Sequence, residues 1–439
     1  HNHGSNVLST MGGYAEGQLV GTAPNAKYYL FITEDINSEN PVEESYWVEA
    51  LEMADSLGVD IVNSSLGYTN YDNINYSYDY SKRNGEIGFA SRGASLAMSK
   101  GIVCVVSAGN DGNKQEKHIS IPADAENILA VGAVTNTESY ASFSSIGTSF
   151  DGRVKPELVA FGEDGSSGAA ALVSGIAGVL HHTYKQQNNG NTAPASLIKA
   201  VLLNSADDVE SPGIDFKSGY GNVNAFNAVN TIVQGHHFTG SVSASTQQQF
   251  NITIPAGIKQ LKVTLVWSDP QSTPNTTKAL LNDLDLELMH TASSTTWQPW
   301  VLNSTASIAA IQQLPVRKRD SLNVVEQISI DLPTAGDYTI TVKGFSIPAG
   351  AQPFSIAYQI DKADTFRWDF PTGSDHLFPD QTNVLRFKSG YASATGQLEI
   401  STDAGSNWQT VDNNIDLSKS YYKLFTPDAI SKALLRMRI

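Results

Sequence analysis

The first half of the chain alternates short apolar runs with segments of helical periodicity. Apolar runs of strand length occupy 27–32, 59–64, 102–107 and 128–134. Between the first two, apolar residues recur every three or four positions over 41–57, a spacing that predicts an amphipathic helix ended by Gly58. Strands that alternate with helices in this way predict an α/β fold, in which helices cover both faces of a parallel sheet.

Two further helices are predicted downstream. The segment 169–184 is small and apolar on almost every side, a pattern typical of a helix buried in the middle of a domain. A second helix is expected at 195–205. We expect this first domain to span 1–234, because the pattern of the chain changes after that point.

From about residue 235 onward, apolar and polar residues alternate in short segments. Examples are 250–254, 261–265 and 338–342, which are separated by clusters of Pro, Gly, Asn and Ser. Period-two runs of this kind predict an antiparallel β-sandwich or jelly roll over 235–361. Residues 362–439 repeat the pattern, with strands expected at 383–387 and 396–401, which predicts a second, smaller β-sandwich.

Composition narrows the possible partners. The chain has 439 residues, and its 44 acidic and 28 basic residues give a formal charge of −16, which repels phosphate backbones and anionic membranes. No apolar stretch reaches the roughly 20 residues needed to span a bilayer. The one cysteine, Cys104, lies in an apolar run and is expected to be a small buried hydrophobe. Because the chain starts with a histidine and no signal-peptide pattern precedes it, its N-terminus is expected to be missing or cleaved.

Three short segments of the first domain carry chemistry-bearing residues in a fixed order. They are His-Gly-Ser-Asn-Val at 3–7, Ser-Ala-Gly-Asn-Asp-Gly at 107–112 and Gly-Ser-Ser-Gly-Ala-Ala at 165–170. Together they resemble the catalytic-histidine, oxyanion-hole and nucleophile segments of the subtilisin-like serine protease (subtilase) family. Weaker matches at 21–26, 63–67 and 155–160 support the resemblance, which covers about half of the chain.

The resemblance implies a role for each matching side chain. His3 would be the general base and acid, because a serine hydroxyl needs an imidazole to take its proton at neutral pH. Ser167 would be the nucleophile, and Asn110 would stabilise the negative charge that develops on the carbonyl oxygen. The backbone at Ser65, Leu66 and Gly67 and at Ser107, Ala108 and Gly109 would pair with an extended substrate.

The carboxylate of the family's catalytic triad is not found among these segments. In subtilases it precedes the histidine in the chain, so the resemblance places it before residue 1. Without that group the histidine can take the wrong tautomer and turnover falls steeply, so the chain as it stands is not expected to be fully active.

Several positions depart from the family's pattern. Asn6 stands where a second histidine is usual, Ser166 where a threonine is usual, and Ala171 where a proline is common. Two residues separate Gly162 from Gly165, where the family has a considerably longer stretch. Either that stretch is deleted or residues are missing from the sequence, and a Gly-Ser-Ser-Gly linker remains an alternative interpretation of this segment.

Three motifs in the second half have structural and functional interpretations. The acidic segment 282–287 could bind calcium, but a strand with a polar acidic face is the simpler interpretation. The segment 401–408 resembles an Asp-box turn and is expected to be a hairpin turn. His236 and His237 are expected to belong to a linker rather than to a metal site.

The function expected from these observations is that of a secreted or cell-surface serine endopeptidase that cuts protein or peptide substrates. No cofactor is expected apart from a possible structural calcium ion, and nucleic acid is not an expected partner. Two alternatives stay open. One is a catalytically inactive peptide-binding or scaffold protein with the protease fold. The other is a protein whose β-domains bind cell-surface glycans or partner proteins.

Overall fold

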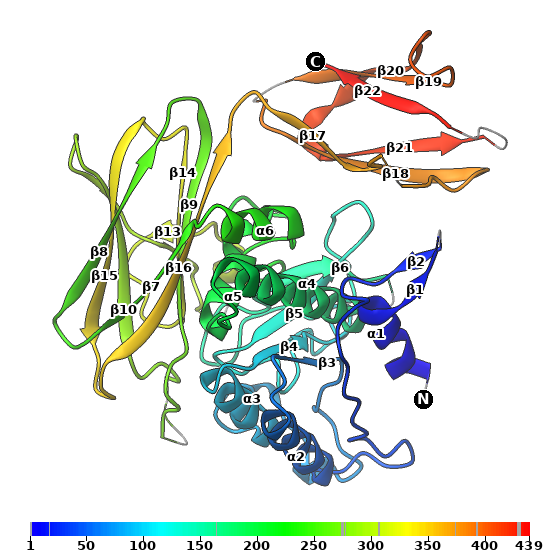
Figure 1. Cartoon of the computed structure of the whole chain (residues 1–439). Helices are drawn as coiled ribbons and strands as arrows, with labels where there is room; N and C mark the ends of the chain where they lie inside the picture. The colour runs from blue at the N-terminus through cyan, green and yellow to red at the C-terminus, as the bar shows by residue number, and fades with distance from the viewer. Residues whose placement is uncertain are drawn as a thin grey trace. The chain divides into compact units, whose positions relative to one another are not determined.

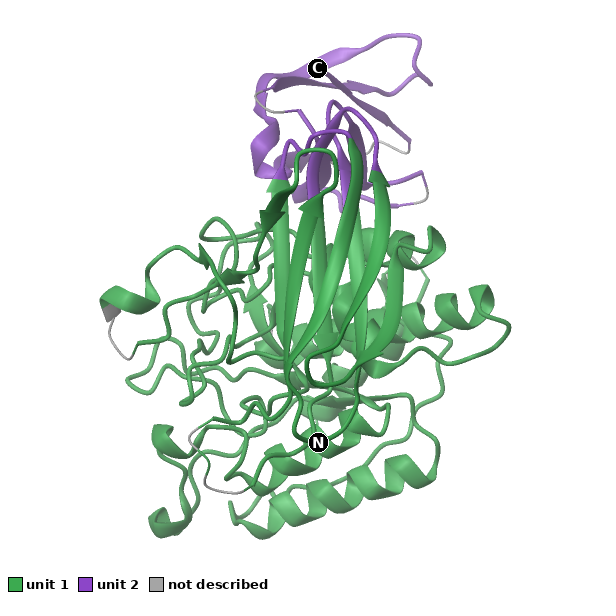
Figure 2. Cartoon of the chain, turned by 90° about the vertical axis from the view of Figure 1, so that its left-hand side faces the viewer, with its two compact units in different colours: residues 1–253, 262–330, 336–359 green, residues 254–261, 331–335, 360–439 purple. Residues whose placement is uncertain are grey.

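The computed structural model describes residues 2–16, 18–163, 165–273, 276, 278–305, 308–373, 375–391, 394–427 and 432–439. The chain forms two compact units, coloured separately in Figure 2. The first comprises 1–253, 262–330 and 336–359, and the second comprises 254–261, 331–335 and 360–439. The first unit therefore contains both an α/β part and most of a β-sandwich. The finer division into three domains, at 234 and 361, stays a prediction.

A parallel sheet forms the centre of the α/β part (Figure 1). Its strand order is β3 (Ile61–Ser64), β4 (Val103–Ser107), β5 (Leu129–Val134) and β6 (Leu158–Phe161). The strands predicted at 59–64, 102–107 and 128–134 are thus confirmed. Every residue of β4 and β5 is buried, as expected of parallel strands that helices cover on both faces.

Helices lie on both faces of this sheet (Figure 1). The long α4 (Ser166–Gln187) packs against all four strands, and α5 (Ala195–Ser205) and α6 (Ala225–Val233) lie beside it. The other face carries α2 (Val42–Ser56) and α3 (Phe89–Ser99). The predicted helices at 41–57, 169–184 and 195–205 are confirmed, and Gly58 ends the first of them with a φ of +71°.

Several elements of the α/β part were not predicted. The chain begins with α1 (Asn2–Gly12), which packs against α4, and continues into a small hairpin of β1 (Tyr14–Ala15) and β2 (Leu19–Val20). Two single turns of 3₁₀ helix follow α2, at Ile74–Tyr76 and Tyr80–Lys82.

The strand predicted at 27–32 is wrong. These residues have no regular secondary structure, and the side chains of Tyr29, Leu30, Phe31 and Ile32 are 54%, 71%, 43% and 85% exposed. A strand needs a neighbour to accept its backbone hydrogen bonds, and no described strand pairs with this segment. At the same time β3 lies at one edge of the described sheet, with no partner on its outer side.

The sandwich part consists of two four-stranded sheets. One has the order β11-β10-β15-β8 and the other β14-β9-β16-β7. Their strands are β7 (His237–Val242), β8 (Gln247–Ile254), β9 (Ile258–Trp267), β10 (Asp283–His290), β11 (Thr295–Trp297), β14 (Val325–Asp331), β15 (Gly336–Ser346) and β16 (Gln352–Lys362). The antiparallel strands predicted at 250–254, 261–265 and 338–342 are confirmed. A jelly-roll topology stays a prediction.

Short elements connect the sandwich strands. A two-residue ladder joins β12 (Trp300–Val301) to β13 (Val316–Arg317), and α7 (Ile308–Ile311) lies between them in the chain. The histidine pair at 236–237 is not a free linker. His237 begins β7, and His236 stacks on Tyr358 with ring centroids 4.4 Å apart.

The C-terminal part of the second unit is built from two three-stranded antiparallel sheets. One sheet has the order β17 (Phe366–Phe370), β18 (Gln381–Ser389) and β21 (Tyr421–Thr426). The other has the order β20 (Gln409–Asp416), β19 (Thr395–Ser401) and β22 (Leu434–Arg438). A 3₁₀ turn lies at Leu417–Lys419. A buried apolar cluster that includes Leu385, Phe387 and Leu398 forms the core between them. The strands predicted at 383–387 and 396–401 are confirmed.

The Asp-box-like segment forms the turn between β19 and β20, which pair as a hairpin. Asp403 accepts hydrogen bonds from the Ser401 hydroxyl at 2.8 Å and from the backbone N–H of Asn407 at 2.8 Å. The backbone and side-chain bonds from Asn407, and then the bond from Ser401, stabilise the ionised form and lower the pKa of Asp403 to about 2. The predicted structural role is therefore confirmed.

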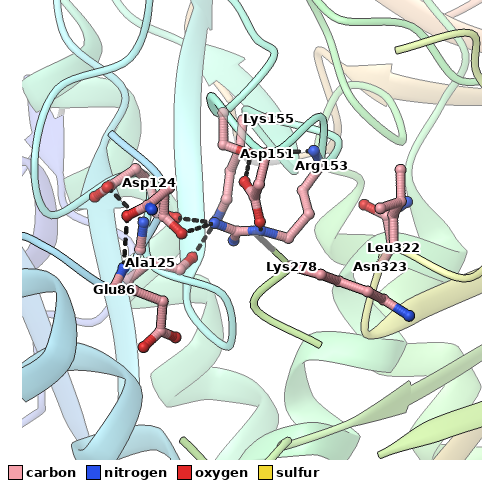
Figure 3. A network of polar contacts seen from close by, with 12 residues as sticks. Glu86, Asp124, Ala125, Asp151, Arg153, Lys155, Lys278, Leu322 and Asn323 are labelled. Atoms are coloured by element: carbon pink, nitrogen blue, oxygen red, sulfur yellow. Dashed lines mark hydrogen bonds and ion pairs between the residues drawn. The ribbon is translucent and has the colours of Figure 1, made fainter. Parts of the chain in front are cut away.

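Buried polar side chains join the α/β part to the sandwich part inside the first unit. The Asn127 amide exchanges two hydrogen bonds, both of 2.9 Å, with the backbone of Asp269. The backbone N–H of Val154 donates to Asn323 Oδ1 at 2.8 Å. Nearby, Arg153 lies between Asp151 and the Asp124–Ala125 segment (Figure 3). These contacts lie inside the first compact unit and join its two parts.

Two sequence expectations on burial and membranes can also be compared with the structure. Cys104 is fully buried, and burial raises the pKa of its thiol to about 12, so it is an unreactive core residue. Within the described ranges, no helix has the length and apolarity required to cross a bilayer.

Candidate active site

The N-terminus of α4 is held by side chains that come from the end of β4. Gly165, just before the helix, has φ +100° and ψ 177°, a backbone conformation that essentially only glycine adopts. The next residue, Ser166, is fully buried, and its backbone N–H donates to Asn110 Oδ1 at 2.9 Å. The Ser166 hydroxyl also contacts Asn110 Oδ1, at 3.0 Å, and the backbone of Gly109. Asn110 therefore caps the first turn of α4.

This cap fixes the orientation of the Asn110 amide. A backbone N–H can only donate, so the amide atom that faces Ser166 must be the oxygen. The amide nitrogen therefore points away from the Ser166 N–H. Because the Asn110 side chain is exposed, its two N–H groups can donate to another acceptor. Beside it, the N–H of Ser167 belongs to the first turn of a helix, where amides have no intrahelical acceptor. Two donors thus lie at the positive end of the α4 dipole.

Ser167 is bonded to the end of β3. Its side chain is 8% exposed, and its hydroxyl donates to the Ser65 carbonyl at 3.4 Å. In return, the Ser65 hydroxyl donates to the Ser167 carbonyl at 2.9 Å. Asn63 Nδ2 donates to the Ser65 hydroxyl at 3.0 Å, and the Ser174 hydroxyl donates to Asn63 Oδ1 at 2.9 Å. A chain of polar side chains therefore fixes Ser167 relative to the sheet.

The third predicted residue lies apart from this network. His3 is exposed in the first turn of α1, the helix that packs against α4. In the part of the chain that the structure describes, no hydrogen bond joins its imidazole to Ser167 or Asn110. The structure thus brings Asn110 and Ser167 together through Ser166, and the catalytic pairing of His3 with Ser167 stays a prediction.

The two predicted substrate-binding segments differ in how much of their backbone is already bonded. Both lie beside the start of α4, since Ser65 bonds Ser167 and Gly109 bonds Ser166. Within 107–109, the Ala108 N–H donates to Val131, the Ala108 carbonyl accepts from Ser120, and the Gly109 carbonyl accepts from Ser145. No described backbone group bonds the N–H groups of 65–67, so this segment is the more available for an extended peptide.

Comparison with known proteins identifies the fold that carries this site. A family model described as "Subtilase family" matches residues 1–221, half of the chain. The chain belongs to the subtilase family. The match covers α1, the four parallel strands and the segment that holds Asn110, Ser166 and Ser167.

Curated subtilase relatives cover part of the chain. Serine protease/ABC transporter B family protein tagA of Dictyostelium discoideum is 22% identical over 335 residues, which are 58% of this chain and 18% of that protein. The thermophilic serine proteinase of Bacillus sp. (strain AK1) is 28% identical over 250 residues, 52% of each protein. Subtilisin DY of Bacillus licheniformis is 27% identical over 234 residues, 51% of this chain and 75% of that protein. The aligned part of this subtilase spans about half or less of the first two relatives.

Solved structures of similar proteins include two proteases. The patellamide maturation protease PatA matches at 22% identity and a TM-score of 0.43, over 53% of this chain and 84% of that chain. Fervidolysin from Fervidobacterium pennivorans matches at 18% identity and a TM-score of 0.39, over 96% of this chain and 60% of that chain.

Sequence reasoning missed three residues that organise the subtilase site. Ser166 was noted only as a departure from a usual threonine, yet its buried hydroxyl and N–H join Asn110 to α4. Asn63 and Ser174 lie 111 positions apart in the chain and meet only in the fold. Asn63 lies in the segment 63–67, which resembles a substrate-binding strand, but the local sequence did not indicate that Ser174 is its partner.

Carboxylates that could hold a metal ion gather in the segment 34–43. Ligand oxygens of Glu34, Glu39 and Glu43 all lie within 4.8 Å of one another. Burial, and then the neighbouring Glu43, raise the pKa of Glu39 to about 7. Both oxygens of Glu43 already accept backbone N–H groups, those of Asp35 at 2.8 Å and Asn40 at 3.2 Å. The cluster therefore has a structural role, because Glu43 stabilises the 35–40 turn through these bonds.

Proposed function

We propose that this subtilase is a serine endopeptidase, with Ser167 as nucleophile, His3 as general base and acid, and Asn110 as oxyanion donor. The observation that carries the proposal is the cap at α4. It holds the carboxamide nitrogen of Asn110 and the N–H of Ser167 at the N-terminus of one helix. Donors fixed in this way can stabilise a developing oxyanion without reorganising during the reaction.

The proposed reaction requires one local rearrangement. The Ser167 hydroxyl, whose proton is directed to the Ser65 carbonyl, must turn toward an imidazole to lose that proton. His3 would take the proton as the hydroxyl attacks the scissile carbonyl and would return it to the leaving amine. The Ser65 to Gly67 backbone would hold the peptide in an extended form alongside.

A fluorophosphonate probe tests this proposal, because it labels activated serine nucleophiles. The intact protein should be labelled, and Ser167→Ala should abolish labelling. The matched control is Ser166→Ala, which removes the neighbouring hydroxyl and leaves the proposed nucleophile in place. If labelling survives Ser167→Ala and disappears in Ser166→Ala, the nucleophile is Ser166 and the proposal is wrong.

A non-catalytic peptide-binding protein is the second candidate function. It is favoured by the bond between the Ser167 hydroxyl and the Ser65 carbonyl, a contact that a protein without hydrolytic activity could keep permanently. Well-folded intact protein that is never labelled, but still binds extended peptides, would support it against the endopeptidase.

We further propose that the substrates are proteins or peptides met outside the cell, or at its surface. Support comes from the family and from the β-sandwich parts appended to the protease fold. Cell fractionation with an antibody against the chain tests the location, and recovery in the cytoplasmic fraction alone would contradict it.

A further inference from the structure

A chain of hydrogen bonds connects the middle of α4 to the proposed nucleophile at its start. Ser174 lies about two turns after Ser167 on this helix, and its side chain is 3% exposed. The Ser174 hydroxyl is 2.9 Å from Asn63 Oδ1, and Asn63 Nδ2 is 3.0 Å from the Ser65 hydroxyl. The Ser65 hydroxyl then bonds the Ser167 carbonyl at 2.9 Å. Three side chains therefore connect the interior of α4 to its first turn by way of β3 and the residue that follows it.

The direction of these bonds is fixed from the Ser167 end. A carbonyl oxygen can only accept, so the single hydroxyl proton of Ser65 is the one donated to Ser167. Ser65 can then only accept from Asn63, which must turn its amide nitrogen toward Ser65 and its amide oxygen toward Ser174. That oxygen needs a donor, and Ser174 supplies its hydroxyl proton. The whole chain of bonds therefore depends on where the Ser174 proton goes.

Ser174 has a second acceptor for that one proton. The carbonyl of Ala170, one helical turn earlier, lies 2.9 Å from the Ser174 hydroxyl, as near as Asn63 Oδ1. If the proton went to Ala170, the Asn63 amide would be better satisfied in the reverse orientation, with its N–H donating to the Ser174 oxygen. The reversed amide would present its oxygen to Ser65 and take the Ser65 proton away from the Ser167 carbonyl.

We propose that Ser174 is a positioning residue for Ser167. By donating to Asn63, it holds the amide in the orientation in which Ser65 donates to the Ser167 carbonyl. The Ser167 hydroxyl bonds the Ser65 carbonyl at 3.4 Å, so the bond from the Ser65 hydroxyl is the shorter of the two that join these residues. Its loss would let the Ser167 hydroxyl move relative to the Asn110 donor, and small displacements of a reacting atom lower turnover. The inference rests on the proposed function, in which Ser167 is the nucleophile.

Steady-state kinetics and the rate of fluorophosphonate labelling test this role in the full chain. Ser174→Ala should lower kcat and the labelling rate about three- to ten-fold, the effect of one hydrogen bond. KM should stay within about two-fold of the wild-type value, because the change removes no group that contacts the peptide. The matched control is Thr183→Ala on the same helix. The Thr183 hydroxyl also bonds a carbonyl one turn earlier, that of Val179 at 2.8 Å, and its removal should leave kcat and the labelling rate unchanged.

A double-mutant cycle separates an effect that passes through Ser65 from a general loss of packing. Because Ser174 acts through Asn63 and Ser65, the double variant Ser65→Ala/Ser174→Ala should be no slower than Ser65→Ala alone. Asn63→Asp keeps the size of the side chain but cannot donate to Ser65, so it should lower kcat at least as much as Ser174→Ala. If Ser174→Ala does not fold, Asn63→Asp takes its place in the cycle.

The outcomes separate this role from the proposed function. If the wild-type protein is labelled and Ser174→Ala is labelled at the same rate, the positioning role is wrong and the endopeptidase proposal stands. Losses that multiply in the double variant also overturn the positioning role, because they show that Ser174 acts independently of Ser65. A well-folded wild-type protein that is never labelled overturns the proposed function, and the role of Ser174 falls with it.

Discussion

Replacing Arg153 with methionine tests whether the buried polar network stabilises the first unit. The Arg153 side chain is 3% exposed, and its Nε donates to Asp151 at 2.7 Å. Its Nη2 donates to the carbonyls of Asn84 and Asp124, both at 2.8 Å (Figure 3). Methionine has a similar length, so the change removes the charge and the donors with little loss of packing.

The expected loss follows from what Arg153→Met leaves behind. The Asp151 carboxylate is 5% exposed and would remain buried with the Ser149 hydroxyl as its partner. Breaking one side of a buried ion pair costs about 3–5 kcal/mol. Arg153→Lys keeps a charge near Asp151 but not the planar fork that reaches both carbonyls, so it should cost roughly 1–3 kcal/mol.

Urea unfolding at pH 7 measures both losses as shifts in the midpoint at a common slope. The control is Lys100→Met, which breaks an ion pair of the same length, 2.7 Å to Asp55, whose side chains are 50% and 42% exposed. That pair should contribute at most about 1 kcal/mol. If Arg153→Met is no more destabilising than Lys100→Met, the buried network does not stabilise the first unit.

Three further predictions concern the site and the junction. Asn110→Ala should lower kcat by a factor of roughly 10²–10³, the loss known for the equivalent amide in subtilisin, a member of this family. Asn110→Asp can still cap α4 but lacks the amide donors, so it should be as inactive. Substantial activity in Asn110→Asp would rule out the oxyanion role. Ser65→Ala should lower kcat about ten-fold with KM unchanged, because Ser65 positions Ser167 through a 2.9 Å bond, and Ser65→Thr should restore it in a steady-state assay. Burial, and then the Asp269 carboxylate, raise the pKa of Glu126, so wild-type stability should fall as pH rises from 5 to 9. Glu126→Gln should flatten that fall in urea titrations, and an unchanged pH profile would contradict the assignment.

Periodicity predicted those elements whose apolar residues face a core. Two strands, at 102–107 and 128–134, and the helix at 195–205 are buried almost throughout. Their sequences are therefore apolar, and polar residues or turn residues on either side indicate where they end. The run at 27–32 is also largely apolar, yet it is not a strand, because ladder partners are decided by topology and not by propensity. In α2, Trp47 and Leu51 of the apolar pattern over 41–57 are buried, but Tyr46 of the same pattern is 48% exposed.

The candidate site was predictable only in part for a related reason. Motifs placed Asn110 and Ser167 in one site because each lies in a short local segment with its own signature. The contacts that hold Ser167 join residues about a hundred positions apart: Ser65, just after β3, bonds Ser167, and Asn63 of β3 bonds Ser174 of α4.

The bare outer side of β3 and the uncovered apolar run at Tyr29–Ile32 have a consequence for this chain in solution. The open edge of β3 in the described sheet can pair with a strand of a second chain, and exposed aromatic and aliphatic side chains favour association. Opposing this, the formal charge of −16 makes copies of the chain repel one another. Salt shortens the range of that repulsion to about 10 Å at 0.1 M, so self-association should grow with ionic strength.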